Sequence, residues 1–172
     1  MVAGAYGGRR LQAPAGLRTR PTADRVREAL FSILGPIGGL RVLDLFAGSG
    51  ALGIEALSRG AASATFIDSA PAAVSAVRRN LAAIGADADV CRRDALGWLA
   101  DAKGPYDLVF ADPPYDSAAG LAGPLAERLP AVLSDHARIV TESDKRAPLS
   151  LALPLVTERV YGDTRIAIHR GR

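Results

Sequence analysis

The sequence predicts an α/β protein with a Rossmann-like sheet of seven strands, mostly parallel, that ends in an antiparallel C-terminal hairpin. Three observations lead to this prediction. Short apolar runs alternate with segments of helical periodicity over most of the chain. A glycine-rich turn at 48–53 joins the first apolar run to the helical pattern that follows it. Near the C-terminus, Gly162 and Asp163 separate two strand-like segments, as in a turn between antiparallel strands.

The individual elements follow from local signals along the chain. Residues 1–21 are rich in Gly, Arg and Pro, and we expect a small basic extension here that can form a β-hairpin. The main domain then covers 22–172 and begins with a helix that Thr22 caps and Gly35 ends. We expect strands at 42–45, 64–67, 89–91, 106–111, 138–142, 155–161 and 165–169, and further helices after the glycine turn and at 71–84, 96–99 and 121–133.

The composition limits the class of protein. With 172 residues, of which 49% are hydrophobic, the chain can bury a substantial core as one domain. A single cysteine excludes an internal disulfide framework, and two histidines leave little material for a metal cluster, so we expect no metal. No apolar run reaches the roughly 18 residues of a membrane span, and the first residues lack the pattern of a signal peptide. We therefore expect a soluble cytoplasmic protein, with a monomer as the default.

Positive charge is concentrated near the N-terminus. Residues 1–40 carry six arginines against two acids, a net charge of +4, whereas the whole chain has a net charge of +3. Such asymmetry indicates a polyanionic partner that contacts one end of the protein. A solvated arginine-rich segment has the same composition, so charge alone leaves both interpretations open.

Four acids, Asp44, Asp68, Asp94 and Asp112, follow or close predicted strands. Because parallel strands end at one edge of a sheet, where such sheets bind ligands, we expect these acids along one rim. Asp68 lies about twenty residues beyond the glycine turn, a spacing suited to ribose hydroxyls. Asp94 is placed to meet an adenine amino group. The turn itself fits both the dinucleotide fingerprint and the Asp-x-Phe-x-Gly-x-Gly motif that binds S-adenosylmethionine.

The sequence Asp112-Pro113-Pro114-Tyr115 distinguishes between these cofactors. Two prolines after a strand fix the backbone and remove two N–H donors. The Asp112 carboxylate and a backbone carbonyl can then hold the N–H groups of an exocyclic amine, so that its lone pair faces an electrophile. Tyr115 offers a flat surface on which a base can stack, worth roughly 1–3 kcal/mol. This arrangement favours transfer of a group to the amine of a nucleobase.

The segments 44–50 and 112–115 together resemble class I S-adenosylmethionine-dependent methyltransferases that act on amino groups. With 8–11, 19–31, 53–61 and 160–164, nearly the whole chain is similar to the RsmD family, which methylates N2 of a guanine in bacterial 16S ribosomal RNA. Asp68 departs mildly from the family pattern, in which Glu is expected more often. Asp offers the same two acceptor oxygens, so the ribose role is retained.

The resemblance implies a role for each matching residue. The cofactor would be S-adenosyl-L-methionine, bound by Asp44, Phe46, Ala47, Gly48, Gly50, Asp68, Asp94 and Ala95. The catalytic residues would be Asp112, Pro113, Pro114 and Tyr115. The partner would be 16S rRNA, alone or within the small ribosomal subunit, with Arg9, Arg10, Arg18, Arg20 and Arg25 on its phosphates. The target base has to be flipped or lie in a loop.

Other functions remain open at this point. A DNA adenine-N6 methyltransferase can use the same Asp-Pro-Pro-Tyr, but it would usually need a target-recognition region for which this chain has no room. A dinucleotide-dependent oxidoreductase would use the glycine turn, yet no acid–base residue for a nicotinamide stands out. A non-catalytic RNA-binding module would not need Asp112. The sequence also does not decide whether Asp112 only orients the amine or takes its proton.

Overall fold

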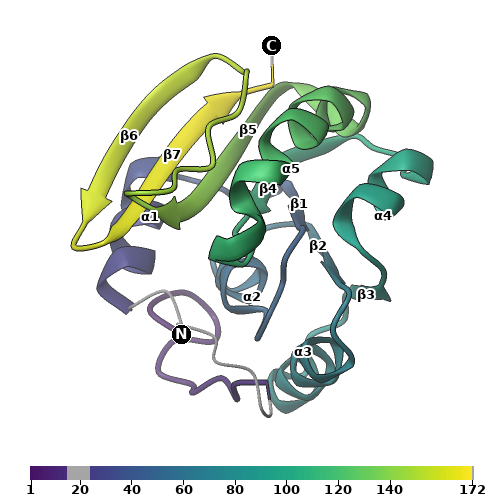
Figure 1. The fold of residues 1–172 in the computed structure, drawn as a ribbon. Helices are drawn as coiled ribbons and strands as arrows, with labels where there is room; N and C mark the ends of the chain where they lie inside the picture. The colour runs from purple at the N-terminus through teal and green to yellow at the C-terminus, as the bar shows by residue number, and fades with distance from the viewer. Residues whose placement is uncertain (15–23, 172) are drawn as a thin grey trace.

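The structure is a computed structural model that describes residues 1–14 and 24–171 of the chain. It has one seven-stranded sheet with helices on both faces, which confirms the predicted fold (Figure 1). The strands are β1 (Arg41–Asp44), β2 (Ser63–Asp68), β3 (Asp89–Arg92), β4 (Tyr106–Ala111), β5 (Leu133–Asp144), β6 (Leu155–Tyr161) and β7 (Thr164–Arg170). The helices are α1 (Asp24–Leu34), α2 (Ala51–Ser58), α3 (Pro71–Ile84), α4 (Ala95–Asp101), α5 (Tyr115–Arg128) and the 3-10 turn η1 (Leu129–Val132).

The order of the strands places the ligand-binding edge. The order is β3-β2-β1-β4-β5-β7-β6. The first five strands run parallel, and β7 is antiparallel to β5 and β6, so β6 and β7 form the predicted hairpin. The order reverses between β1 and β4. Their carboxyl ends therefore flank the crevice in which sheets of this kind bind ligands.

Two hydrophobic cores lie on opposite faces of the sheet. On one face, α1, α2 and α3 pack around a core that includes Ile54, Val77 and Phe66. On the other face, α4 and α5 contribute to a core that includes Val109 and Leu125. Each strand between β2 and β5 is thus covered on both sides, which explains its nearly continuous apolar sequence. Among the described residues, no helix has the length and apolarity to cross a bilayer.

Two elements differ from the prediction by more than two residues at an end. The helix expected at 121–133 begins at Tyr115, because Pro114 ends the extended turn at its N-cap and the chain becomes helical directly after it. The glycines and the proline inside that helix hid its first turns from the sequence pattern. The strand expected at 138–142 extends over β5, because Leu133 pairs with β4 and Asp144 pairs with β7.

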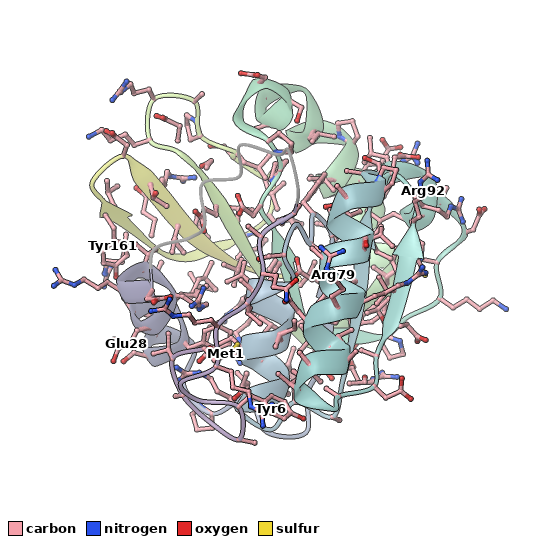
Figure 2. The ribbon with its side chains drawn as sticks, turned by 90° about the horizontal axis from the view of Figure 1, so that it is seen from below. Met1, Tyr6, Glu28, Arg79, Arg92 and Tyr161 are labelled. Carbon is pink, nitrogen blue, oxygen red and sulfur yellow. The ribbon has the colours of Figure 1, made fainter. Side chains whose placement is uncertain are left out.

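The N-terminal segment, residues 1–14, forms turns without a strand and lies against α2 and α3 (Figure 2). The rest of the predicted hairpin and the predicted cap Thr22 lie outside the described residues. The N–H groups of Val2 and Ala3 donate to the buried carboxylate of Glu55 at 2.9 and 3.0 Å. Glu55 also accepts from Arg59 Nε at 2.8 Å, so its buried charge is paired. The segment is anchored to α2 by this carboxylate.

Candidate active site

The turn between β1 and α2 has the geometry of a cofactor cradle. The Ala47 N–H donates to the Ile67 carbonyl at 3.0 Å, which fixes the turn to β2. Gly48 and Gly50 have φ values of +55° and +80°, a left-handed conformation that glycine adopts readily. A Cβ on Gly48 would meet no atom within 4 Å, so the backbone here faces open space. A ligand can therefore approach the main chain closely.

Gly53 is required for the packing of α2 on the sheet. A Cβ at this position would lie 2.3 Å from Cε1 of Phe66 in β2. This is the role of the third glycine in a nucleotide-binding turn, which allows the helix to approach the strand. The Gly53 N–H also donates to Oδ2 of Asp44 at 3.1 Å. Close packing thus brings the start of α2 onto the acid that ends β1.

Asp44 is a buried acid, with 2% of its surface exposed. Burial raises its pKa from the ordinary 3.8 to about 7; the bond from Gly53 opposes this effect and the charge of Asp68 adds to it. A carboxylate in this environment is stabilised in its ionised form by a nearby cation. The amino group of a bound methionine moiety would be such a cation, so Asp44 fits S-adenosylmethionine.

Asp68 holds the glycine turn in shape. Its Oδ2 accepts from the Gly48 N–H at 2.9 Å, and its Oδ1 accepts from the Ala70 N–H at 2.8 Å. An ionised carboxylate offers about four acceptor positions. Two acceptor positions therefore remain for ribose hydroxyls while both hydrogen bonds from the backbone are kept.

Asn80 of α3 links the cradle to the N-terminal segment, which the sequence analysis missed. Its side chain is buried, with 2% exposed. Nδ2 donates to the carbonyls of Ser49 at 2.8 Å and Gln12 at 3.0 Å. Oδ1 accepts from the Gln12 N–H at 2.8 Å. The amide pairs with three backbone polar atoms at once, so the position of the glycine turn depends on the segment that lies along α3.

Three further predicted cofactor-binding residues, Asp94 and Ala95 after β3 and Phe46 after β1, have structural roles of their own. Asp94 is exposed and caps α4, because its Oδ1 accepts from the Gly97 N–H at 2.8 Å. Ala95 is buried at the first position of that helix, and Phe46 packs at the margin of the second core. The expected contact of Asp94 with adenine remains a prediction beside this capping role.

Asp112 follows β4 on the same rim as Asp44. The β1–β4 register pairs Asp44 with Phe110, two residues before Asp112. Burial raises the pKa of Asp112 well above its usual value, and the charges of Glu142 and Asp44 raise it further. Pro113 is buried and Pro114 is the N-cap of α5. The side chain of Tyr115 lies outside the described part of the chain.

Glu142 belongs to this site, although the sequence analysis did not select it. In the β4–β5 ladder Ala111 pairs with Thr141, so the next residues, Asp112 and Glu142, lie side by side. Glu142 is buried, with 5% exposed. The sequence did carry a signal for Glu142, because it ends a predicted apolar strand like the four acids predicted along the sheet edge. It was overlooked because Glu142 was treated as the end of a strand.

The predicted RNA-binding arginines divide into two groups. Arg9 and Arg10 are exposed in the N-terminal segment, and Arg25 is exposed on α1. Arg18 and Arg20 lie outside the described residues. In the parts of the chain that the structure describes, no group of three or more His, Cys, Asp and Glu side chains could hold a metal ion. The described side chains of the site are carboxylates around a glycine turn.

Comparisons with known proteins agree with this geometry. The family described as "Conserved hypothetical protein 95" matches residues 1–170. The Ribosomal RNA small subunit methyltransferase D of Escherichia coli K12 is 46% identical over 117 residues, which cover 67% of this chain and 59% of that protein. A solved structure of a Thermus hypothetical protein is 32% identical, with a TM-score of 0.84, and covers 98% of this chain and 96% of that chain.

A more distant structure shares the fold alone. The Thermus thermophilus 16S rRNA N2 G1207 methyltransferase, solved with AdoMet and guanosine, is 21% identical with a TM-score of 0.75. The match covers 92% of this chain and 45% of that chain.

Proposed function

The chain belongs to the Conserved hypothetical protein 95 family, and we propose that it transfers a methyl group from S-adenosylmethionine to N2 of a guanine in the 16S rRNA of the small ribosomal subunit. The observation that carries this proposal is the position of the Asp112 turn. It lies beside Asp44 at the reversal of strand order, one strand away from the glycine cradle. An amine held by Asp112 would then lie next to a methyl donor in that cradle. We expect the reaction to take place in the cytoplasm, where rRNA is available.

The chain's own residues account for binding of the donor. Asp44 would meet the amino group, the main chain at Gly48 would pass beneath the methionine part, and Asp68 would accept from the ribose hydroxyls. Asp94 and Ala95 would frame the adenine. When bound, S-adenosylmethionine supplies an electrophilic methyl group on its sulfonium. The protein's contribution to catalysis is then largely the positioning of the amine.

The pair of carboxylates favours guanine over adenine as the target. The Watson–Crick edge of guanine presents N1–H and the N2 amino group, which are adjacent donors. Adenine presents an amino group beside N1, which is an acceptor. Asp112 and Glu142 lie close enough for the charge of Glu142 to raise the pKa of Asp112. The positive sulfonium of a bound methyl donor would favour the ionised forms of both groups, in which carboxylates only accept. Two adjacent acceptors complement two adjacent donors, whereas adenine N1 would face a carboxylate.

A methylation assay tests the proposal. Purified protein and labelled S-adenosylmethionine would be incubated with 16S rRNA, with small subunits from a strain that lacks the homologous enzyme, or with duplex DNA. We expect N2-methylguanosine in rRNA after nucleoside analysis. Asp112→Ala should abolish transfer while it retains binding of S-adenosylhomocysteine, and Asp116→Ala, at an exposed acid in the first turn of α5, should remain active. N6-methyladenine in DNA without a mark in rRNA would refute the assignment.

A second substitution separates the two roles open to Asp112. Asp112→Asn keeps an acceptor oxygen that can orient the amine but has no basicity with which to take its proton. If orientation is sufficient, this variant keeps most of the activity that Asp112→Ala loses. If proton transfer is required, both variants are inactive. The comparison is independent of which nucleotide in rRNA is modified.

A further inference from the structure

The N-terminal segment follows α3 toward the active site. Arg9 donates to the Ala83 carbonyl at 2.9 Å, near the end of α3 that is distant from the cradle. Three residues later, Gln12 is bound by Asn80, which also holds the Ser49 carbonyl in the cradle. The segment therefore runs along the helix from its C-terminal end to the cofactor turn, and Figure 2 shows Arg79 beside it.

The N-terminal segment and α3 together form a surface that carries arginine side chains. Their guanidinium groups hydrogen-bond only to neutral acceptors. Arg79 donates to Gln12 Oε1 at 3.2 Å and to Ser75 Oγ at 2.7 Å, and Arg78 donates to a backbone carbonyl of β3 at 3.2 Å. Among the described residues, none of Arg9, Arg10, Arg78 and Arg79 forms an ion pair, whereas seven other basic side chains do. Their positive charges are therefore uncompensated.

No acid is available within either segment to neutralise them. Residues 1–23 contain no Asp or Glu, and the sequence of α3 contains none. Asp87 and Asp89 follow α3 and line a hollow with Arg78, and Asp68 precedes the first residue of the helix. These acids bound the basic surface at the two ends of the helix. Between them, Arg78, Arg79 and the adjacent N-terminal segment form a basic surface on the C-terminal half of α3.

We propose that this surface, formed by Arg9, Arg10, Arg78 and Arg79 and called here the α3 track, binds the phosphate backbone of the RNA that flanks the target base. The proposal rests on the proposed function and extends it to a face of the protein without a catalytic role. The contacts from Ser75 to Ala83 span about 12 Å along the helix at its 1.5 Å rise. That length matches on the order of three successive phosphates.

Salt-dependent binding tests the track. The variant Arg78→Gln/Arg79→Gln removes two charges, and Arg159→Gln/Arg170→Gln removes the same charge from exposed positions on β6 and β7 at the opposite side of the sheet. Binding of fluorescent 16S rRNA transcript would be measured by anisotropy over a series of salt concentrations. We expect the slope of log K against log salt to become less negative by about 1.4–1.8 for the first variant and to change little for the second.

Two further measurements distinguish this proposal from the proposed function. S-adenosylhomocysteine affinity and kcat at saturating RNA should be unchanged in the α3 variant, while KM for RNA rises. The proposed α3 track would be overturned if the Arg78→Gln/Arg79→Gln variant had the same salt slope as the wild-type protein. It would also be overturned if both double variants lost the same RNA affinity. Either result would count even if rRNA is methylated normally. Failure of the wild-type protein to methylate rRNA would instead overturn the proposed function.

Discussion

Asp44→Asn should make the protein more stable and its cofactor binding weaker. The folded protein holds the pKa of Asp44 at about 7, against 3.8 for the ordinary group. Between these values the folded state binds more protons than the unfolded state, so wild-type stability falls as pH rises through this window. The amide can still accept from Gly53 but carries no charge to desolvate. The stability of the variant therefore does not show this fall as pH rises through the window.

The magnitude follows from the two pKa values. Integration of the linkage relation from pH 5 to pH 8 shows that the free energy of unfolding of the wild-type protein falls by roughly 2–3 kcal/mol relative to that of the variant. For a chain of this size that corresponds to roughly 5–10 °C in Tm. The assay is thermal unfolding at both pH values, with Asp135→Asn, at an exposed acid of β5, as the control. At pH 8 S-adenosylhomocysteine should raise the Tm of wild type more than that of the variant. An Asp44→Asn stability that follows the wild-type pH dependence would refute the reasoning.

Three further predictions concern the same site and its support. Glu142→Gln removes a charge that raises the pKa of Asp112, so the acidic limb of kcat/KM should move to lower pH; an unmoved limb would contradict a role for ionised Asp112. Asn80→Ala leaves buried backbone groups unpaired, so the free energy of unfolding measured by chemical denaturation should fall by about 2–4 kcal/mol. Asn80→Asp should not restore S-adenosylhomocysteine affinity, because the carbonyls of Ser49 and Gln12 need a donor. Gly53→Ala should cost about 1–3 kcal/mol by overpacking, whereas Gly120→Ala, which meets no atom within 4 Å, should not destabilise the protein.

The sequence was sufficient to predict the sheet and its rim because both are encoded locally. Each central strand is covered on two faces, so it appears as a short apolar run. Each of the four selected acids follows such a run, and the parallel arrangement brings these positions to one edge. The glycine turn could be recognised for a similar reason, since its backbone conformation is set by residues adjacent in the chain.

The hydrogen bonds that hold the N-terminal segment and the glycine turn in place could not be predicted, because the residues that form them are distant in sequence. Val2 and Glu55 are 53 positions apart, and Gln12 and Asn80 are 68 positions apart. Neither pair has a periodic or spacing signal, because a buried carboxylate and a buried amide on helices look like ordinary polar residues in a sequence. Glu142 ends an apolar run, as the selected acids do, but its proximity to Asp112 appears only when β5 is placed beside β4.

The two hydrogen bonds that Asp68 accepts from backbone N–H groups affect how inactive variants of this protein should be designed. One carboxylate keeps the main chain at Gly48 in shape and is also the expected ribose acceptor. An amide in its place could accept from only one of the two N–H groups through its oxygen, and its nitrogen would oppose the other. Loss of activity in an Asp68 variant would therefore mix a deformed turn with a lost ligand contact. Asp112→Ala is the cleaner inactive control for studies in cells, because it leaves the cradle intact.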